Sequence, residues 1–249
     1  TQGPIQDMLH IYFKGEATNH QKEEIMGCFK LMQNADSLGS IMKFNINEGT
    51  RLLIKQTTDY WCSQEIVPEE VRTQIDTFKL ILALTEKYHA LVMNPPYMGR
   101  SGMNDLITQY VRDNYALGKW DLFATFMLVA INRLEINAKM SMINMHSWMF
   151  LDAFDALRMY FVKNFQIDNM LHLGPNTFDE LSGEVVQNTT FVISKNRPNH
   201  AGDYYKLSTG NNCAAKEQLF LNDYGHYRNV NQLRFDTIPS CPIAYWLSI

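Results

Sequence analysis

The stretch of sequence that decides the fold runs from a short apolar segment into two adjacent prolines: Ala90-Leu91-Val92-Met93-Asn94-Pro95-Pro96-Tyr97. Four consecutive apolar residues are typical of a strand that is buried on both faces, as in a parallel sheet. The two prolines cannot donate to a sheet ladder, so the strand has to end at Met93. In an open α/β sheet, ligands bind outside the carboxyl ends of the strands. Residues 94–97 are therefore predicted to form a ligand site at the edge of a sheet.

The sequence on both sides of this stretch predicts an alternation of helices and strands. Pro68-Glu69-Glu70 has the proline and the acidic first turn of a helix that runs to about Lys87. Residues 40–46 have the alternating pattern of a short strand. The remaining predicted helices cover 19–35, 103–115, 120–135 and 150–164, and the remaining strands cover 140–145, 167–173 and 185–193. This succession indicates an α/β fold in which the last two strands form an antiparallel pair.

The composition of the 249 residues is that of a folded globular protein, with 46% hydrophobic and 12% aromatic residues. A net charge of −4 argues against nucleic-acid binding through bulk positive charge, although a local basic groove remains compatible with it. The four cysteines lie far apart without a CxxC pair, which fits a reduced, cytoplasmic chain. The longest apolar run has ten residues, whereas a membrane span needs about 20. We therefore expect neither a membrane span nor a signal peptide.

The seven histidines are too dispersed to suggest a metal site. None of them pairs with another at ligand spacing, so no metal is expected. His146 and His172 each border a predicted strand and are interpreted as structural residues. The chain begins at Thr1 and not at a methionine, which suggests an excised segment of a longer protein.

Residues 94–97 combine the groups that hold an exocyclic amine. The side chain of Asn94 and the backbone of Pro95 each offer a carbonyl acceptor, and the prolines remove competing N–H donors. Two acceptors on one NH₂ group leave the nitrogen lone pair free to face an electrophile. Tyr97 supplies an aromatic face on which a planar base or amide stacks. The chemistry that fits is methyl transfer to nitrogen by in-line displacement, promoted by positioning and charge stabilisation.

Several stretches resemble the catalytic half of the gamma class of amino-methyltransferases. In chain order these are Asn-Pro-Pro-Tyr at 94–97, Asp121-Leu122-Phe123, Ser147-Trp148, His172-Leu173-Gly174 and the run 185–192. More narrowly, four stretches are similar to the large adenine methyltransferases of bacteriophage-exclusion systems and to related single-chain restriction–modification enzymes. They are Asn-Pro-Pro-Tyr-Met-Gly, Ser-Trp-Met-Phe-Leu, Phe-Asp-Glu-Leu-Ser-Gly-Glu-Val-Val-Gln-Asn and Pro-Ile-Ala-Tyr-Trp.

This resemblance implies a Rossmann-like class I fold, with S-adenosylmethionine as methyl donor and double-stranded DNA with a flipped adenine as substrate. It places Phe178 as a second stacking face for the adenine. Asp121 either approaches the cofactor or serves only as a helix N-cap. Arg100, in a Gly/Ser-rich loop, is the predicted contact with DNA phosphate. The implied role is the marking of self DNA against phage, with further defence-system proteins as possible partners; the oligomeric state is not predicted.

The chain also departs from the family pattern. Its thirteen glycines include no GxG, and nothing before residue 90 resembles the Asp-Pro-x-x-Gly-x-Gly cofactor loop. We therefore interpret residues 1–88 as the remainder of the cofactor-side region with a helical insertion and 89–197 as the catalytic half. Residues 198–249, which are polar and rich in Gly and Asn, are interpreted as a linker toward a missing target-recognition domain. The fold is expected to be incomplete and the chain inactive on its own.

Two alternative functions remain open. Asn-Pro-Pro-Tyr also serves methyltransferases that act on RNA bases or on protein glutamine side chains. Those proteins end soon after their last strand, whereas this chain continues for about fifty residues beyond its last predicted strand. A non-catalytic methyltransferase-like subunit would also lack the glycine loop, although the intact tetrapeptide argues against it.

Overall fold

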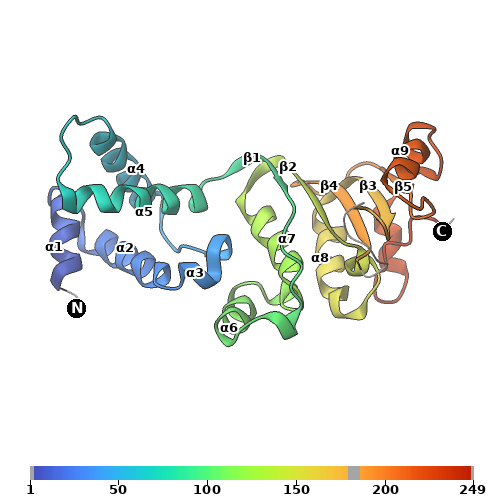
Figure 1. The fold of residues 1–249 in the computed structure, drawn as a ribbon, viewed down its shortest axis with the longest axis horizontal. Helices are drawn as coiled ribbons and strands as arrows, with labels where there is room; N and C mark the ends of the chain where they lie inside the picture. Colours follow the sequence, from blue (N-terminus) through green and yellow to red (C-terminus); the bar gives the residue numbers. More distant parts are fainter. Residues whose placement is uncertain (1–2, 179–185, 248–249) are drawn as a thin grey trace. The chain divides into compact units, whose positions relative to one another are not determined.

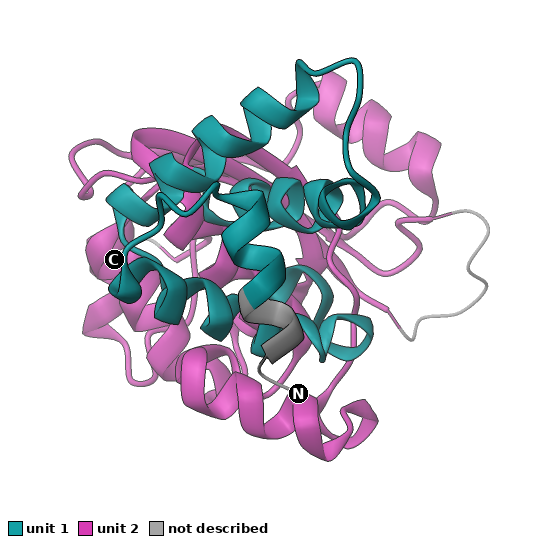
Figure 2. Cartoon of the chain, turned by 90° about the vertical axis from the view of Figure 1, so that its left-hand side faces the viewer, with its two compact units in different colours: residues 1–86 teal, residues 87–249 magenta. Residues whose placement is uncertain are grey.

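The computed structural model describes residues 3–178 and 186–247 of the chain. The chain divides into two compact units, residues 1–86 and 87–249 (Figure 2). The second unit begins directly before the strand that leads into residues 94–97. The candidate site therefore belongs to the second unit.

The first unit is helical in its described part. Its elements are α1 (Gly3–Tyr12), α2 (Asn19–Met32), α3 (Ala35–Leu38), the short 3-10 helix η1 (Gly39–Ile41), α4 (Glu48–Cys62) and α5 (Glu69–Thr85) (Figure 1). The starts of α2 and α4 follow from local chemistry, because Thr18 and Asn47 accept hydrogen bonds from free backbone N–H groups of the first turn. Thr18 and Gln21 form a complete capping box. The predicted helices at 19–35 and after Pro68 are confirmed.

The strand predicted over residues 40–46 is wrong. The segment is the end of η1 followed by irregular backbone. Three of its four apolar side chains, those of Ile41, Met42 and Phe44, are buried. They anchor the connection between α3 and α4 in the core of the unit, so the alternation reflects burial of a loop and not the two faces of a sheet.

In its described residues, the second unit is built on a six-stranded sheet. Its strands are β1 (Tyr88–Met93), β2 (Leu134–Met145), β3 (Gln166–Gly174), β4 (Asn188–Ser194), β5 (Gly202–Lys206) and β6 (His226–Val230), in the spatial order β1-β2-β4-β3-β5-β6. β1 is parallel to β2 and β5 is parallel to β3, whereas β4 is antiparallel to both β2 and β3. β6 is antiparallel to β5. Four strands therefore end at one edge, which we call the carboxyl edge. The α/β class and the antiparallel pair of β3 and β4 are confirmed.

Helices and 3-10 turns connect these strands. They are η2 (Arg100–Gly102), α6 (Asp105–Asn114), η3 (Ala116–Gly118), α7 (Leu122–Arg133), η4 (His146–Met149), η5 (Asp152–Phe154), α8 (Asp155–Asn164), α9 (Cys213–Leu221) and η6 (Gln232–Thr237). Most residues of α7 are buried, which makes it the central helix of this unit's core. Gly118 packs so closely on α7 that a Cβ there would lie 2.6 Å from the backbone nitrogen of Thr125. This close approach requires glycine at position 118.

The strand before the tetrapeptide forms as predicted but is not buried on both faces. β1 is an edge strand, at one end of the sheet order, so within the described residues it pairs with β2 alone. Val92 is 81% exposed, and three of the six strand residues are exposed. The apolar run identified the strand correctly, but the prediction of burial on both faces is wrong for this structure, because the described residues leave Val92 and two further side chains of β1 exposed.

The described part of 198–249 is not a linker. It supplies β5, α9, β6 and η6 to the same compact unit. Tyr204, Phe235 and Tyr245 from this segment are at most 2% exposed. The buried guanidinium of Arg158 also donates to backbone carbonyls of Ser240 and of the loop before α8. The strands were missed because each has only five residues and lies among turn-forming residues, where periodicity carries little signal.

Candidate active site at the carboxyl edge of the sheet

The carboxyl edge brings together segments that are far apart in the sequence. β1 ends at Met93 and leads into residues 94–97, and the neighbouring β2 ends at Met145. The reversed strand β4 begins at the same edge, because Asn188 pairs with Met145 on one side and with Gly174 of β3 on the other. The tetrapeptide therefore lies where the fold class places a ligand site.

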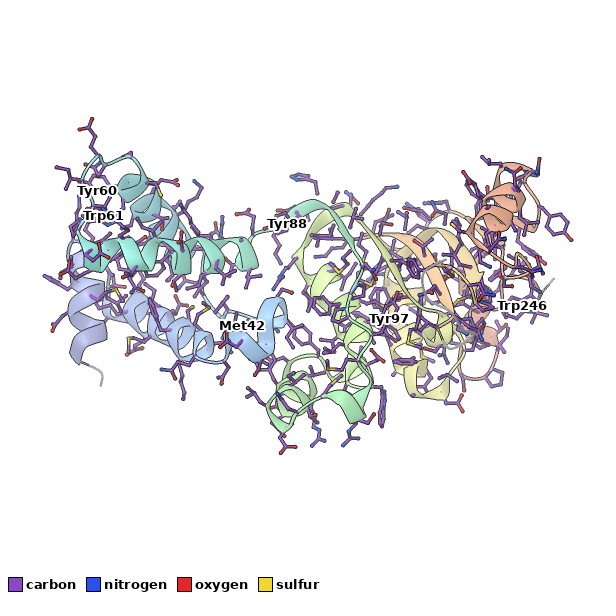
Figure 3. All side chains as sticks on the ribbon, in the orientation of Figure 1. Met42, Tyr60, Trp61, Tyr88, Tyr97 and Trp246 are labelled. Atoms are coloured by element: carbon purple, nitrogen blue, oxygen red, sulfur yellow. The ribbon has the colours of Figure 1, made fainter. Side chains whose placement is uncertain are left out.

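Tyr97 is the best-held residue of the tetrapeptide. Figure 3 labels its side chain in the second unit. Its hydroxyl donates to the carbonyl of Ile143 at 3.3 Å and accepts from Nδ2 of Asn188 at 3.0 Å. The ring forms a T-shaped pair with Phe123 of α7 at a centroid distance of 6.4 Å. Burial raises the pKa of the Tyr97 hydroxyl, and the hydrogen bond from Asn188 acts in the opposite direction. The phenol is therefore neutral at physiological pH, and its ring is held from two directions.

The other residues of the tetrapeptide differ in exposure. Pro95 is buried, whereas Asn94 and Pro96 are exposed. The backbone there belongs to no helix or strand, as expected for two prolines after a strand. Asn94 therefore lies on the surface directly after β1, where its amide is accessible to a ligand.

Asp121 connects the segment after the tetrapeptide to α7. Its Oδ1 accepts from the backbone N–H of Phe123 at 3.2 Å, as an N-cap, and from the backbone N–H of Met98 at 3.1 Å. Leu122 N–H donates to the carbonyl of Met98 at 3.0 Å, and Gly99 and Asp121 form an isolated antiparallel bridge. Burial raises the pKa of the Asp121 carboxyl, and these backbone donors oppose the shift. Asp121 is observed as the N-cap of α7, and its proposed approach to the cofactor stays a prediction.

The structure shows where Arg100 and Phe178 lie, but their contacts do not define a functional role for either residue. Arg100 is exposed at the start of η2, and its guanidinium lies 5.6 Å from the ring centroid of Trp120. Phe178 is 37% exposed and follows β3. Residues 179–185, which include most of the Phe-Asp-Glu-Leu-Ser-Gly-Glu-Val-Val motif and the first residue of the predicted strand 185–193, lie outside the described residues. The assignments of Arg100 to DNA and Phe178 to stacking remain predictions.

The carboxyl edge also holds two asparagines that sequence reasoning did not select. Asn144 of β2 and Asn188 of β4 are completely buried. Among the described residues, the Oδ1 atom of neither side chain has a hydrogen-bond partner. The sequence carried a signal for Asn144, which interrupts an apolar strand, but not for Asn188, which begins β4 within a polar run. That signal alone does not reveal which residue Asn144 contacts.

Beside the asparagines, two histidines and a tyrosine form a hydrogen-bonded chain. Nδ1 of His146 and Nε2 of His172 are 2.9 Å apart, and Nδ1 of His172 lies 3.1 Å from the hydroxyl of Tyr245. Burial, with the charges of His146 and Lys206 adding to it, lowers the pKa of His172 to about 4. Burial also lowers the pKa of His146. The pair therefore stays uncharged at neutral pH and connects η4, β3 and the segment at 245, which fits the structural role expected for both histidines.

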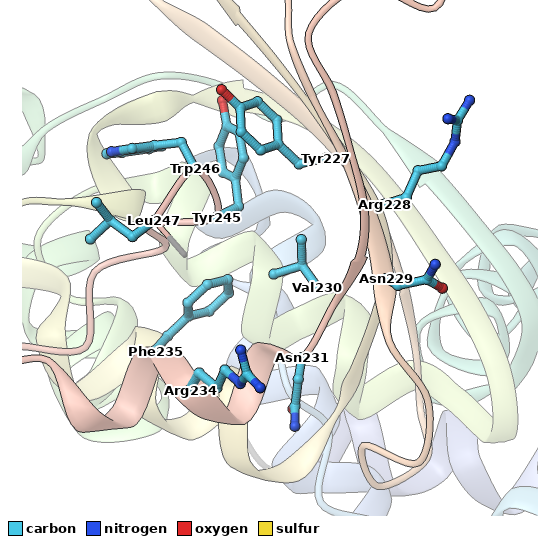
Figure 4. Close-up of a pocket in the computed structure, with 10 residues that line it drawn as sticks. All are labelled: Tyr227, Arg228, Asn229, Val230, Asn231, Arg234, Phe235, Tyr245, Trp246 and Leu247. Atoms are coloured by element: carbon cyan, nitrogen blue, oxygen red, sulfur yellow. The ribbon is translucent and has the colours of Figure 1, made fainter. Parts of the chain in front are cut away.

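A separate cleft of about 500 Å³ lies between β6, η6 and residues 245–247 (Figure 4). Tyr227, Tyr245 and Trp246 lie together at one end of it, whereas Arg228 points away from them. Arg228 also pairs with Asp223. The sequence did not predict this cleft, and it contains none of the tetrapeptide residues.

Two classes of feature are absent from the described residues. Within 3–178 and 186–247, no group of three or more His, Cys, Asp and Glu side chains is arranged to hold a metal ion. In the same residues, the helices are too short or too polar to cross a bilayer.

Residues 13–178, which are two thirds of the chain, match the family model of the Eco57I restriction-modification methylases. The chain belongs to this methylase family. It is 40% identical over 170 residues to the adenine-specific methyltransferase BrxX of Escherichia coli O9:H4 (strain HS). It is 38% identical over 172 residues to the adenine-specific methyltransferase PglX of Lacticaseibacillus casei (strain Zhang). Each match covers 67% of this chain and 14% of the relative, so the chain spans a small part of the length of these proteins.

Among solved structures, a DrdV–DNA complex resembles the chain with a TM-score of 0.50 and 14% identity. The match covers 71% of this chain and 19% of that one, and at this identity it supports the fold alone. Together with the sheet order, the family membership confirms the expected Rossmann-like α/β fold of class I methyltransferases. It also confirms the resemblance to methyltransferases of phage-exclusion and restriction–modification systems.

Proposed function

We propose that this chain holds the acceptor of an adenine-N6 DNA methyltransferase reaction. The observation that carries the proposal is the position of Asn94-Pro95-Pro96-Tyr97 at the carboxyl edge, with the Tyr97 ring held by Asn188, Ile143 and Phe123. The relatives BrxX and PglX are named as adenine-specific methyltransferases, which supports adenine over other amines.

In the proposed reaction, the adenine leaves the duplex and enters the carboxyl edge. The side-chain carbonyl of Asn94 and the backbone carbonyl of Pro95 accept the two hydrogens of the exocyclic amine. The base stacks on Tyr97, and Phe178 provides the second face. The nitrogen would form its bond to the methyl carbon while the carbon–sulfur bond of the donor breaks, with S-adenosylhomocysteine as the leaving group. The nitrogen carries positive charge until one amine proton is lost to solvent, and the two carbonyl dipoles stabilise that charge. The Asn94 amide is exposed, so an incoming base reaches it without rearrangement of the core.

The residues of this chain do not by themselves form a complete site for S-adenosylmethionine. The sequence contains no GxG, and Oδ1 of Asp121 already accepts from two backbone N–H groups. We infer that the main cofactor-binding groups lie outside these 249 residues and that the chain alone is inactive. The expected result of isothermal titration with S-adenosylmethionine is no binding tighter than about 100 μM. A tighter complex would show that the chain carries a cofactor site of a different kind.

A role in phage defence or restriction–modification fits the relatives, and it makes duplex DNA the substrate and the cytoplasm the location. Arg100 is the residue we assign to a DNA phosphate near the flipped base. A methylation assay on duplex DNA, RNA and protein glutamine, made with the full gene product that contains this chain, tests the substrate class. Preferential labelling of RNA or protein would favour the alternative amino-methyltransferases, and no labelling of any substrate would favour a non-catalytic subunit.

The decisive variant is Asn94→Ala in the full gene product. Loss of one preorganised acceptor at the developing charge is expected to lower kcat for DNA methylation by about 100-fold or more. DNA affinity, measured by fluorescence anisotropy, should change little because Asn94 makes no phosphate contact in the proposed complex. Asn211→Ala, which replaces an exposed asparagine before α9, is the control and should keep full activity. Full activity of Asn94→Ala would overturn the catalytic assignment.

A further inference from the structure

Tyr97 needs more than exposure to serve as a stacking face. Base stacking depends on the plane of the ring, and a tyrosine ring turns about two side-chain torsions unless its surroundings hold it. Phe123 packs against the ring in a T-shaped pair. The hydroxyl end is held by two hydrogen bonds, of which only that with Asn188 comes from another side chain.

Asn188 is well suited to hold this hydroxyl. It is the first residue of β4, is completely buried, and lies between β2 and β3 in the sheet. Its Nδ2 donates to the Tyr97 hydroxyl at 3.0 Å and lies 3.4 Å from the carbonyl of Asn144. The antiparallel ladder fixes its backbone on both sides, so the donor is preorganised.

The carbonyl oxygen of the Asn188 side chain argues against a purely structural role for this residue. Oδ1 of Asn188 and Oδ1 of Asn144 have no partner among the described residues, although both are buried. A buried carbonyl without a partner is unfavourable, and such groups are uncommon in folded proteins unless they serve a purpose. An apolar residue of similar size would fill the same space without that cost.

We propose that Asn188 is a positioning residue, which fixes the plane of the Tyr97 ring through the hydrogen bond to its hydroxyl. Asn188 acts on the base only through Tyr97. The effect of Asn188 on methylation rests on the proposed function, whereas its effect on the orientation of the Tyr97 ring does not. Burial raises the pKa of Tyr97 and keeps its hydroxyl protonated, so the hydroxyl can accept from Asn188 and donate to Ile143 at the same time.

The kinetic test is a double-mutant cycle in the full gene product, with Asn188→Leu, Tyr97→Phe and the double variant. We expect Asn188→Leu to lower kcat/KM for DNA methylation by about tenfold. We expect the same substitution to cause no further loss in the Tyr97→Phe background, where the hydroxyl is absent. Equal losses in both backgrounds would show that Asn188 acts independently of Tyr97 and would overturn the proposal.

Thr189→Val is the matched control. Thr189 is the next residue of β4, is also completely buried, and donates to the carbonyl of Leu171 at 3.1 Å, away from Tyr97. Its removal deletes a buried hydrogen bond of the same strand. Any effect of Thr189→Val should be the same with and without the Tyr97 hydroxyl, and an effect that disappears in the Tyr97→Phe background would assign the coupling to the strand and not to Asn188.

A second test uses the 249-residue chain without substrate, so that it remains informative if the full gene product does not methylate DNA. In NMR spectra of tyrosine-labelled chain, the Tyr97 ring signal is identified by its loss in Tyr97→Phe. Asn188→Leu should shift that signal and accelerate ring flipping, and Thr189→Val should not. If Asn188→Leu does not fold, the reciprocal measurement applies, in which Tyr97→Phe shifts the side-chain NH₂ signals of Asn188. Unchanged signals in either measurement would overturn the proposal.

Discussion

At the scale of single residues, three contacts hold the Tyr97 side chain in the candidate site. Its hydroxyl contacts two neighbouring strands, through the carbonyl of Ile143 and the amide of Asn188. Phe178 has no comparable anchor in the described structure and is 37% exposed. The two residues proposed to stack on the base therefore differ: Tyr97 is preorganised, and Phe178 has an accessible ring that can take its position when the base binds.

Substitution of either aromatic residue is expected to weaken the complex with a flipped base. Tyr97→Ala and Phe178→Ala should each cost about 1–3 kcal/mol, because each removes one stacking face. The measurement is the affinity of the full gene product for duplex DNA with 2-aminopurine at the target position. Phe220→Ala, which replaces a partly exposed ring on α9, is the control. An unchanged affinity in Phe178→Ala would remove Phe178 from the site.

At the scale of elements, the start of α7 and the segment after the tetrapeptide form one structural unit. Asp121 caps α7 and accepts from the N–H of Met98, and the carbonyl of Met98 accepts from Leu122. The helix N-terminus thus positions the backbone directly after Tyr97. The helix was predicted from its apolar periodicity and Asp121 was recognised as a possible N-cap, but the bond to Met98 depends on the tertiary fold.

Asp121→Ala is expected to destabilise the chain by about 1–2 kcal/mol, because it leaves the N–H groups of Phe123 and Met98 without their acceptor. The measurement is chemical unfolding of the 249-residue chain. Asp121→Asn retains an acceptor oxygen and should recover most of the loss. If Asp121→Ala is as stable as the unsubstituted chain, the cap does not hold the site segment.

At the scale of the whole second unit, the hydrogen bonds among His146, His172 and Tyr245 connect η4 and β3 to a segment over seventy residues away in sequence. Phe150 packs against both histidines and against Trp246, which closes an aromatic layer over this end of the sheet. The layer is uncharged at neutral pH because burial disfavours the imidazolium form of each histidine.

The free energy of unfolding is expected to decrease as the pH is lowered, because of this layer. The pKa of His172 is about 4 in the folded chain and 6.5 without the fold, so between these values the unfolded chain binds more protons. The contribution of neutral His172 is fully present above about pH 6.5 and is lost as the pH falls toward 4, by at most about 3 kcal/mol. Unfolding free energies measured at pH 7 and pH 5 should show the loss, and His172→Phe should reduce it. His89→Gln, which replaces an exposed histidine, should not.

The sequence by itself determined the features that depend on local covalent chemistry. Two prolines end β1 wherever that strand lies, and an asparagine with a proline carbonyl defines an amine-binding tetrapeptide before any fold is known. The helices that begin at good caps or have long apolar periods were predicted for the same reason. Only the tertiary structure decided that β1 is an edge strand, that residues 202–230 join the sheet, and that Asn188 reaches Tyr97. These depend on strand pairing and side-chain contacts between residues up to 91 positions apart, which local propensity does not encode.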